Sequence, residues 1–144
     1  MKKLFLNWEE VKKMVVSLAK KIKNDFDPDV IVGVVRGGLI PGVWISHLLG
    51  DKQFRTIHVK YYLGSKRAEK PVLIEDIGKI EGKVLVIDDV VDTGSSLSFV
   101  VSRLKKKGAK EVRTAALAYK PHSFTKPDYF IFETDRWIVF PWER

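Results

Sequence analysis

The sequence contains no cysteine, which excludes disulfide frameworks, thiolate zinc sites and cysteine nucleophiles. Histidines are scarce as well: His47, His58 and His122 lie far apart in the chain, without the spacing of a built-in zinc site. No apolar run approaches the roughly 18 residues that a membrane span needs. The apolar run before Asn7 is only three residues long, too short for the core of a signal peptide, so we expect a cytoplasmic protein.

The composition is that of one soluble globular domain, and we expect residues 1–144 to form it. Of the 144 residues, 45% are hydrophobic and 31% charged. A chain of this size buries about 68–70% of its unfolded surface on folding, which is enough for a stable core without disulfide bonds or a structural metal. The 26 basic against 18 acidic residues give a net charge of +8, which favours a polyanionic partner, either nucleic acid or a polyphosphate metabolite.

Helical and strand patterns alternate along the chain. An amphipathic helix is predicted over residues 7–26 with Asn7 as its N-cap, and further helices over residues 40–49 and 94–107. Apolar, β-branched runs predict strands at residues 30–35, 55–62, 72–75, 83–89, 112–120 and 128–133. This alternation predicts an α/β fold with a mostly parallel sheet. Residues 63–70 are polar and basic without periodicity, which predicts a mobile loop.

Three carboxylates, Asp88, Asp89 and Asp92, follow an apolar strand at the edge where open α/β sheets bind ligands. Two carboxylates about 4 Å apart repel by roughly 4 kcal/mol at an effective dielectric near 20. Such a cluster therefore needs a divalent cation, a basic side chain or donated hydroxyl protons. The next residues, 93–96, supply a glycine, three hydroxyls and the N–H groups of a helix start, which together form a phosphate cradle. A phosphorylated sugar fits both parts of this segment, because its hydroxyls can donate to the carboxylates and its phosphate can accept from the turn.

Two other classes of protein share parts of this segment. The Asp92-Thr93-Gly94 triplet matches the aspartic-protease signature, but that fold is all-β and here the triplet opens a helix. Receiver domains carry an acidic pair at a strand end, but near their N-terminus. The ATP-binding G-x-x-x-x-G-K-[ST] loop is absent.

The segment Val84 to Leu97 resembles the phosphoribosyl pyrophosphate (PRPP) motif of the type I phosphoribosyltransferases: four hydrophobics, two acids and a D-T-G-x-[ST] turn. Residues 32–42 are similar to the pyrophosphate loop of that family, and residues 118–121 to the lysine strand of its 6-oxopurine enzymes. Residues 135–143 are similar to the aromatic tail of the xanthine-guanine enzymes. The resemblance implies a Rossmann-like core with a mostly parallel five-stranded sheet flanked by helices, and a small hood formed by residues 121–144.

The resemblance also implies roles in binding PRPP. Asp88 and Asp89 would accept the ribose hydroxyls, directly or through Mg²⁺, and Asp92 would be the catalytic group that exchanges the N7 proton of the base. The 5′-phosphate would be wrapped by Asp92, Thr93, Gly94, Ser95 and Ser96. Arg36 and Gly37 would hold the pyrophosphate, at a place where family members often have a non-proline cis peptide.

Four residues would hold the base. Lys120 would donate to the purine 6-oxygen, Trp137 would stack on the ring, and Ile138 would present main-chain groups to its edge. Glu143 lies where the tail of the family has an acidic residue near the 2-position of the purine. The loop 63–70, with Lys66 and Arg67, would close over the reaction centre and exclude water.

The implied activity belongs to purine salvage. It transfers the 5-phosphoribosyl group of PRPP to N9 of guanine, xanthine or hypoxanthine and releases pyrophosphate, with Mg²⁺ as cofactor. The alternative is a regulator of the same fold that binds PRPP or a nucleotide together with nucleic acid, through the basic residues of 8–23 and 105–110, without catalysis. Because Lys120 and Trp137 supply base-binding elements, we favour the enzyme and do not expect nucleic acid as a partner. We expect a homodimer or a higher homo-oligomer.

Overall fold

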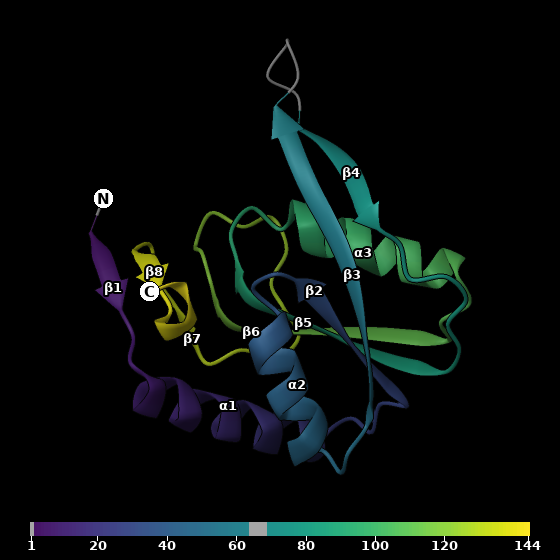
Figure 1. Ribbon diagram of the computed structural model, residues 1–144, viewed down its shortest axis with the longest axis horizontal. Helices are drawn as coiled ribbons and strands as arrows, with labels where there is room; N and C mark the ends of the chain where they lie inside the picture. The colour runs from purple at the N-terminus through teal and green to yellow at the C-terminus, as the bar shows by residue number, and fades with distance from the viewer. Residues whose placement is uncertain (1, 64–68) are drawn as a thin grey trace.

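A mixed sheet with helices on both faces is the centre of the computed structural model, which describes residues 2–63 and 69–144 (Figure 1). Within these residues the sheet has six strands in the order β4-β3-β2-β5-β6-β7. The strands are β2 (Val30–Val35), β3 (Gln53–Leu63), β4 (Glu69–Glu75), β5 (Lys83–Val91), β6 (Glu111–Tyr119) and β7 (Phe132–Glu133). Every neighbouring pair is parallel except β3 and β4. The α/β class with a mostly parallel sheet is therefore confirmed, with six strands in the sheet where the resemblance implied five.

The helices cover the sheet on both sides. They are α1 (Trp8–Lys23), α2 (Leu39–Leu48) and α3 (Ser95–Lys106). Side chains of α1 and α2 share one hydrophobic cluster with Ile31 and Leu85, whereas those of α3 share a second cluster with Val32 and Val84 on the other face. The central strands β2 and β5 are apolar along almost their whole length because both faces are covered.

Local signals in the sequence explain the helix ends. Asn7 caps α1 as predicted, since its Oδ1 accepts a hydrogen bond from the Glu10 N–H at 2.8 Å. The other two helices begin within one residue of the predicted positions, and Gly108 follows α3 with a φ of 117°. No helix within residues 2–63 and 69–144 has the length and apolar character needed to cross a bilayer.

The segment predicted to contribute a hood, residues 121–144, pairs with the N-terminal part of the chain. The strand β8 (Trp137–Val139) pairs in parallel with β1 (Lys3–Phe5), and a short 3₁₀ turn, Pro141–Glu143, follows. Figure 1 shows these two ends of the chain side by side. The strand β1 is absent from the sequence analysis, because a three-residue strand has too little pattern to be recognised in a sequence.

The predicted loop 63–70 is shorter in the structure than in the sequence analysis. β3 continues to Leu63 and β4 begins at Glu69, and the two strands rise together above the rest of the sheet (Figure 1). The candidate residues Lys66 and Arg67 lie outside the described residues, so their predicted role is not tested. The predicted strand 128–133 is interrupted: Phe132 and Glu133 join the sheet as β7, and Tyr129 pairs with Ala115 of β6 in an isolated parallel bridge.

Candidate active site at the carboxyl edge of the sheet

The acidic end of β5 separates two hollows. Asp88 and Asp89 are half-buried, and successive residues of a strand point to opposite faces. Asp88 lines a small hollow of about 100 Å³ together with the turn that follows β5. Asp89 lines a larger cavity of about 600 Å³ together with Arg36 and Glu143. A ligand gripped by both carboxyl groups would therefore extend from one hollow into the other.

Burial disfavours the charged forms of the Asp88 and Asp89 carboxyl groups. Burial raises the pKa of Asp88 well above its usual range, and the neighbouring charge of Asp89 raises it further. Burial also raises the pKa of Asp89, with a further contribution from the charge of Glu143. Because the two groups titrate together, the pair favours a state that holds a proton or receives positive charge.

This donor set fits a magnesium ion held jointly with a substrate. Within residues 2–63 and 69–144 no group of three or more His, Cys, Asp or Glu side chains could enclose a metal by itself. Magnesium in phosphate-handling enzymes is usually bound by one or two carboxylates, with waters and substrate oxygens as the remaining ligands. Asp88 and Asp89 supply such carboxylates, and their raised pKa values indicate a place where positive charge is favoured.

The turn after β5 forms an anion cradle. Gly94 has a φ of 97°, the left-handed conformation that favours glycine, and α3 begins at the next residue. The Thr93 hydroxyl accepts a hydrogen bond from the Ser95 N–H at 3.2 Å and donates one to the Ser95 hydroxyl at 3.1 Å. Thr93, Gly94 and Ser96 line the small hollow with Asp88. The first N–H groups of a helix have no partner within it, so this turn is suited to a phosphate group.

The loop after β2 lies directly against the acidic pair. A Cβ atom at Gly37 would fall on the carboxyl group of Asp89, and one at Gly38 would fall on the carbonyl oxygen of Ile87. The two glycines thus allow the backbone to approach β5 closely. The peptide bond between Val35 and Arg36 is cis, as the resemblance implied, and Arg36 is exposed on the wall of the larger cavity.

Lys120 connects the end of β5 with the hood. Its backbone N–H donates to the carbonyl of Val91 at 2.9 Å, and its ammonium group donates to the carbonyl of Arg136. The Lys120 residue is only 6% exposed, so this hydrogen bond partly compensates for the burial of the charge. Arg136 directly precedes Trp137, whose side chain is 52% exposed. The structure therefore brings together Lys120 and Trp137, two of the four residues that the sequence analysis predicts for base binding.

Ile138 presents its main chain rather than its side chain. The side chain packs in the hydrophobic core and is 6% exposed. The Trp137 N–H donates to the carbonyl of Lys2 at 2.9 Å, and the carbonyl of Val139 accepts from the Leu6 N–H at 3.0 Å. Both neighbours of Ile138 thus bond toward β1. Since the direction alternates along a strand, the N–H and C=O groups of Ile138 point away from β1.

Glu143 lies on the wall of the larger cavity, beside the loop that follows β2. One carboxylate oxygen accepts a hydrogen bond from the Phe140 N–H at 2.6 Å, which fixes the side chain across the 3₁₀ turn. Glu143 lines the larger cavity with Arg36 and Asp89, and Trp142 lies on the same wall. The Trp142 ring stacks on Phe140 with their centroids 4.6 Å apart, so it forms a rigid side of the cavity.

Two side chains at this site have no role in the sequence analysis. The His122 Nε2 lies 2.7 Å from Oδ1 of Asp92. The Tyr61 hydroxyl donates to the Ser95 carbonyl at 2.7 Å, which ties β3 to the start of α3. The position of His122 directly after Lys120-Pro121 was the available signal, because that segment already belonged to a motif of the site.

Comparisons with known proteins agree with this geometry. Residues 3–143 match the family model described as phosphoribosyl transferase domain. The xanthine-guanine phosphoribosyltransferase of Idiomarina loihiensis is 31% identical over 99% of this chain and 88% of its own. Among solved structures, the purine phosphoribosyltransferase from Pyrococcus horikoshii is 48% identical with a TM-score of 0.91, covering 100% of this chain and 95% of its own. The Helicobacter pylori xanthine-guanine-hypoxanthine enzyme is 28% identical with a TM-score of 0.80, covering 98% and 93%.

Proposed function

Because the chain belongs to the phosphoribosyl transferase domain family, we propose that it transfers the 5-phosphoribosyl group of PRPP to N9 of a 6-oxopurine. Its relatives support the coarser statement that it is a phosphoribosyltransferase of purine salvage. The observation that carries the finer proposal is the arrangement around β5. An acidic strand end and an anion cradle lie beside a buried lysine and a half-exposed tryptophan.

The two hollows divide PRPP between them in this proposal. The 5′-phosphate would occupy the small hollow, where the first turn of α3 and residues 92–96 surround it. The ribose hydroxyls would donate to Asp88 and Asp89, whose raised pKa values favour such donors. The pyrophosphate would occupy the larger cavity beside Arg36 and the backbone of Gly37. Asp88 and Asp89 would also hold Mg²⁺, which when bound supplies positive charge to the pyrophosphate and ribose oxygens.

The base would lie between β5 and the hood. Lys120 has three N–H donors, of which one is directed to the Arg136 carbonyl, so the others are available for the purine 6-oxygen. The exposed face of Trp137 would stack on the purine ring. The outward N–H and C=O of Ile138 would bond to the base edge. Glu143 would reach the 2-position with the carboxylate oxygen that Phe140 does not use.

The reaction follows from these positions. The C1′–O bond to pyrophosphate breaks and its electron pair leaves with the pyrophosphate, which Arg36 and the Gly37 backbone hold. Positive charge develops on the sugar and is stabilised by the nearby carboxylates of Asp88 and Asp89. The lone pair of N9 forms the new bond to C1′. Asp92 accepts the N7 proton, so the product purine is neutral and the proton resides on this carboxyl group.

One assay tests the proposal and its base selectivity. The protein is incubated with PRPP and Mg²⁺ and separately with guanine, xanthine, hypoxanthine or adenine, and both pyrophosphate and nucleoside monophosphate are quantified. We expect product from one or more of the 6-oxopurines and none from adenine, because a lysine ammonium cannot donate to a 6-amino group. Product from adenine alone, or from no base, would overturn the proposal. The homodimer or larger assembly stays a prediction, which light scattering after gel filtration checks.

A further inference from the structure

His122 lies against the carboxylate assigned to proton exchange. The Nε2 atom of His122 is 2.7 Å from Oδ1 of Asp92, a hydrogen bond between residues 30 positions apart in the chain. His122 belongs to the turn that follows β6, and Asp92 to the turn that follows β5. The contact therefore joins two adjacent loops at the carboxyl edge of the sheet.

Backbone contacts hold the two loops in register. The Phe124 N–H donates to the Thr93 carbonyl at 3.0 Å, and the Ser123 N–H donates to the Lys120 carbonyl at 3.0 Å. Thr125 packs so closely on Gly94 that a Cβ at Gly94 would lie 2.5 Å from the Thr125 methyl group. These contacts do not involve the imidazole. The position of the His122 backbone is thus fixed independently of its hydrogen bond to Asp92.

We propose that His122 is a positioning residue that holds the Asp92 carboxylate for proton exchange with the purine. This inference rests on the proposed function. By bonding Oδ1, the imidazole would leave Oδ2 to face N7 of the base and would restrict rotation of an otherwise exposed side chain, of which 63% is accessible. An imidazole can donate a hydrogen bond from Nε2 to a carboxylate oxygen, which is the contact that the geometry shows.

The size of the effect should differ between stability and rate. A solvent-exposed pair of this kind contributes little to folding, since water competes for both partners. Its effect on chemistry can be larger, because a small misplacement of a catalytic group can lower a rate by about a hundredfold. Removing His122 should therefore impair the chemical step much more than the fold or the binding of PRPP.

The test compares His122→Ala, His122→Gln and a matched control in single-turnover formation of the nucleoside monophosphate. We expect His122→Ala to lower that rate about tenfold to a hundredfold, with KM for PRPP within about twofold and Tm within about 2 °C of the wild type. His122→Gln should restore the rate to within about fivefold of the wild type, because its amide N–H can reach the place of Nε2.

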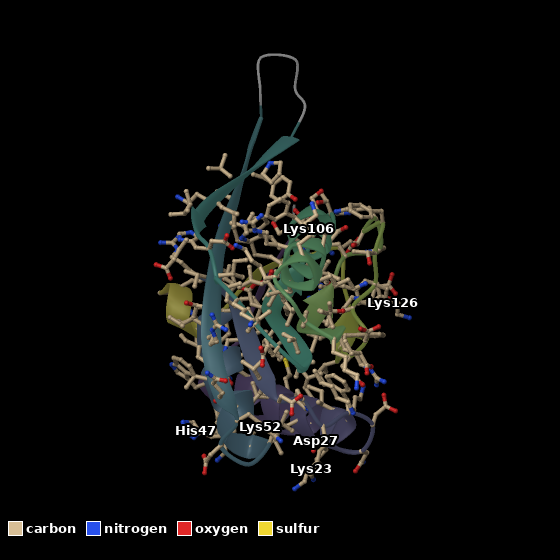
Figure 2. The ribbon with its side chains drawn as sticks, turned by 90° about the vertical axis from the view of Figure 1, so that its right-hand side faces the viewer. Lys23, Asp27, His47, Lys52, Lys106 and Lys126 are labelled. Atoms are coloured by element: carbon tan, nitrogen blue, oxygen red, sulfur yellow. The ribbon has the colours of Figure 1, made fainter. Side chains whose placement is uncertain are left out.

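His47 supplies the control. Its Nδ1 lies 2.8 Å from Oδ1 of Asp51, and both side chains are exposed as in the His122 pair. Figure 2 shows His47 at the end of the molecule that holds Asp27 and Lys52, away from Lys126 in the segment after His122. His47→Ala should leave both the single-turnover rate and KM unchanged.

Each outcome decides between the claims. A wild-type protein without turnover overturns the proposed function and this inference with it. An active wild type with His122→Ala as fast as His47→Ala overturns the inference alone. A His122→Ala protein that loses stability and PRPP affinity in proportion to its rate, without rescue by glutamine, shows a structural role and also overturns it.

Discussion

Replacing Asp88 and Asp89 together by asparagine separates their effect on stability from their effect on PRPP. The amides keep the size of the carboxyl groups and one oxygen each. They can therefore keep the hydrogen bonds that the two Oδ1 atoms accept from the Asp89 and Val90 N–H groups, at 2.8 and 2.7 Å. Only the charges are lost. We expect the double variant to lose turnover and yet to be more stable than the wild type at pH 7.

The expected gain follows from the sign of the pKa shifts. Burial holds the pKa of both carboxyls above the usual range, so the folded state binds protons that the unfolded state has released. The contribution of this pair to the stability of the wild type is therefore fully present at low pH and is lost as the pH rises through these raised pKa values. Two charges about 4 Å apart would repel by roughly 4 kcal/mol, and partial protonation relieves part of this. We expect a gain of about 1–3 kcal/mol on neutralisation, or roughly 3–9 °C in Tm.

Thermal unfolding measured from about pH 3 to pH 8, with turnover measured at pH 7, provides the assay. The difference in Tm should shrink as the pH falls and vanish below about pH 3.8, where aspartate is protonated in both the folded and the unfolded wild type. Turnover should fall by more than about a hundredfold at pH 7. Glu81→Gln is the control, because this exposed carboxylate pairs only at the surface with Lys79 at 3.3 Å. Its Tm should change by no more than about 1 °C.

Two results would refute the reasoning, and they refute different parts of it. Turnover equal to that of the wild type in the Asp88→Asn, Asp89→Asn protein would show that neither residue binds PRPP. Lost turnover with a lower Tm at pH 7 would leave the site assignment standing but contradict the electrostatic argument.

Three further substitutions test the base site and the fold. Trp137→Ala should raise KM for the base about tenfold and leave KM for PRPP and the Tm nearly unchanged, because a half-exposed residue adds little to the core. Equal effects on the KM of both substrates would show that Trp137 packs against the protein and does not stack on the base. Lys120→Met keeps the apolar stem but loses the charged donor, so kcat/KM for guanine should fall by about tenfold to a hundredfold. Asn7→Ala should lower Tm by about 3 °C without changing either KM, as thermal scans and steady-state kinetics would show.

Features encoded by neighbouring residues could be predicted from the sequence. The Asn7 cap, the apolar strand β5 and the left-handed turn at Gly94 each depend on a few consecutive residues, and all three are present in the structure. The loop at residues 32–42 was recognised by its resemblance, and the structure shows why it holds Gly37 and Gly38: neither has a side chain to keep the backbone from β5.

Features that depend on distant contacts could not be predicted. The strand β1 has three residues and exists as a strand through its pairing with β8, more than 130 positions away. The bond between His122 and Asp92 joins two loops whose separation in space is set by the neighbouring strands β5 and β6. The placement of Glu143 depends on the hydrogen bond that its carboxylate accepts from the Phe140 N–H, within a turn that no strong sequence pattern predicts.

The pairing of β1 with β8 has a consequence for how the two parts of the proposed site are assembled. In the proposed enzyme the phosphate turn and the acidic pair depend on strands β2, β5 and β6 and on the loop after β6, where the Phe124 N–H donates to the Thr93 carbonyl. The wall for the nucleobase needs the first and the last residues at once. Leu6, Ile138 and Phe140, which flank or belong to these two strands, are also buried in the hydrophobic core. A substitution that weakens the pairing of β1 with β8 would therefore disturb the proposed base site and the core together.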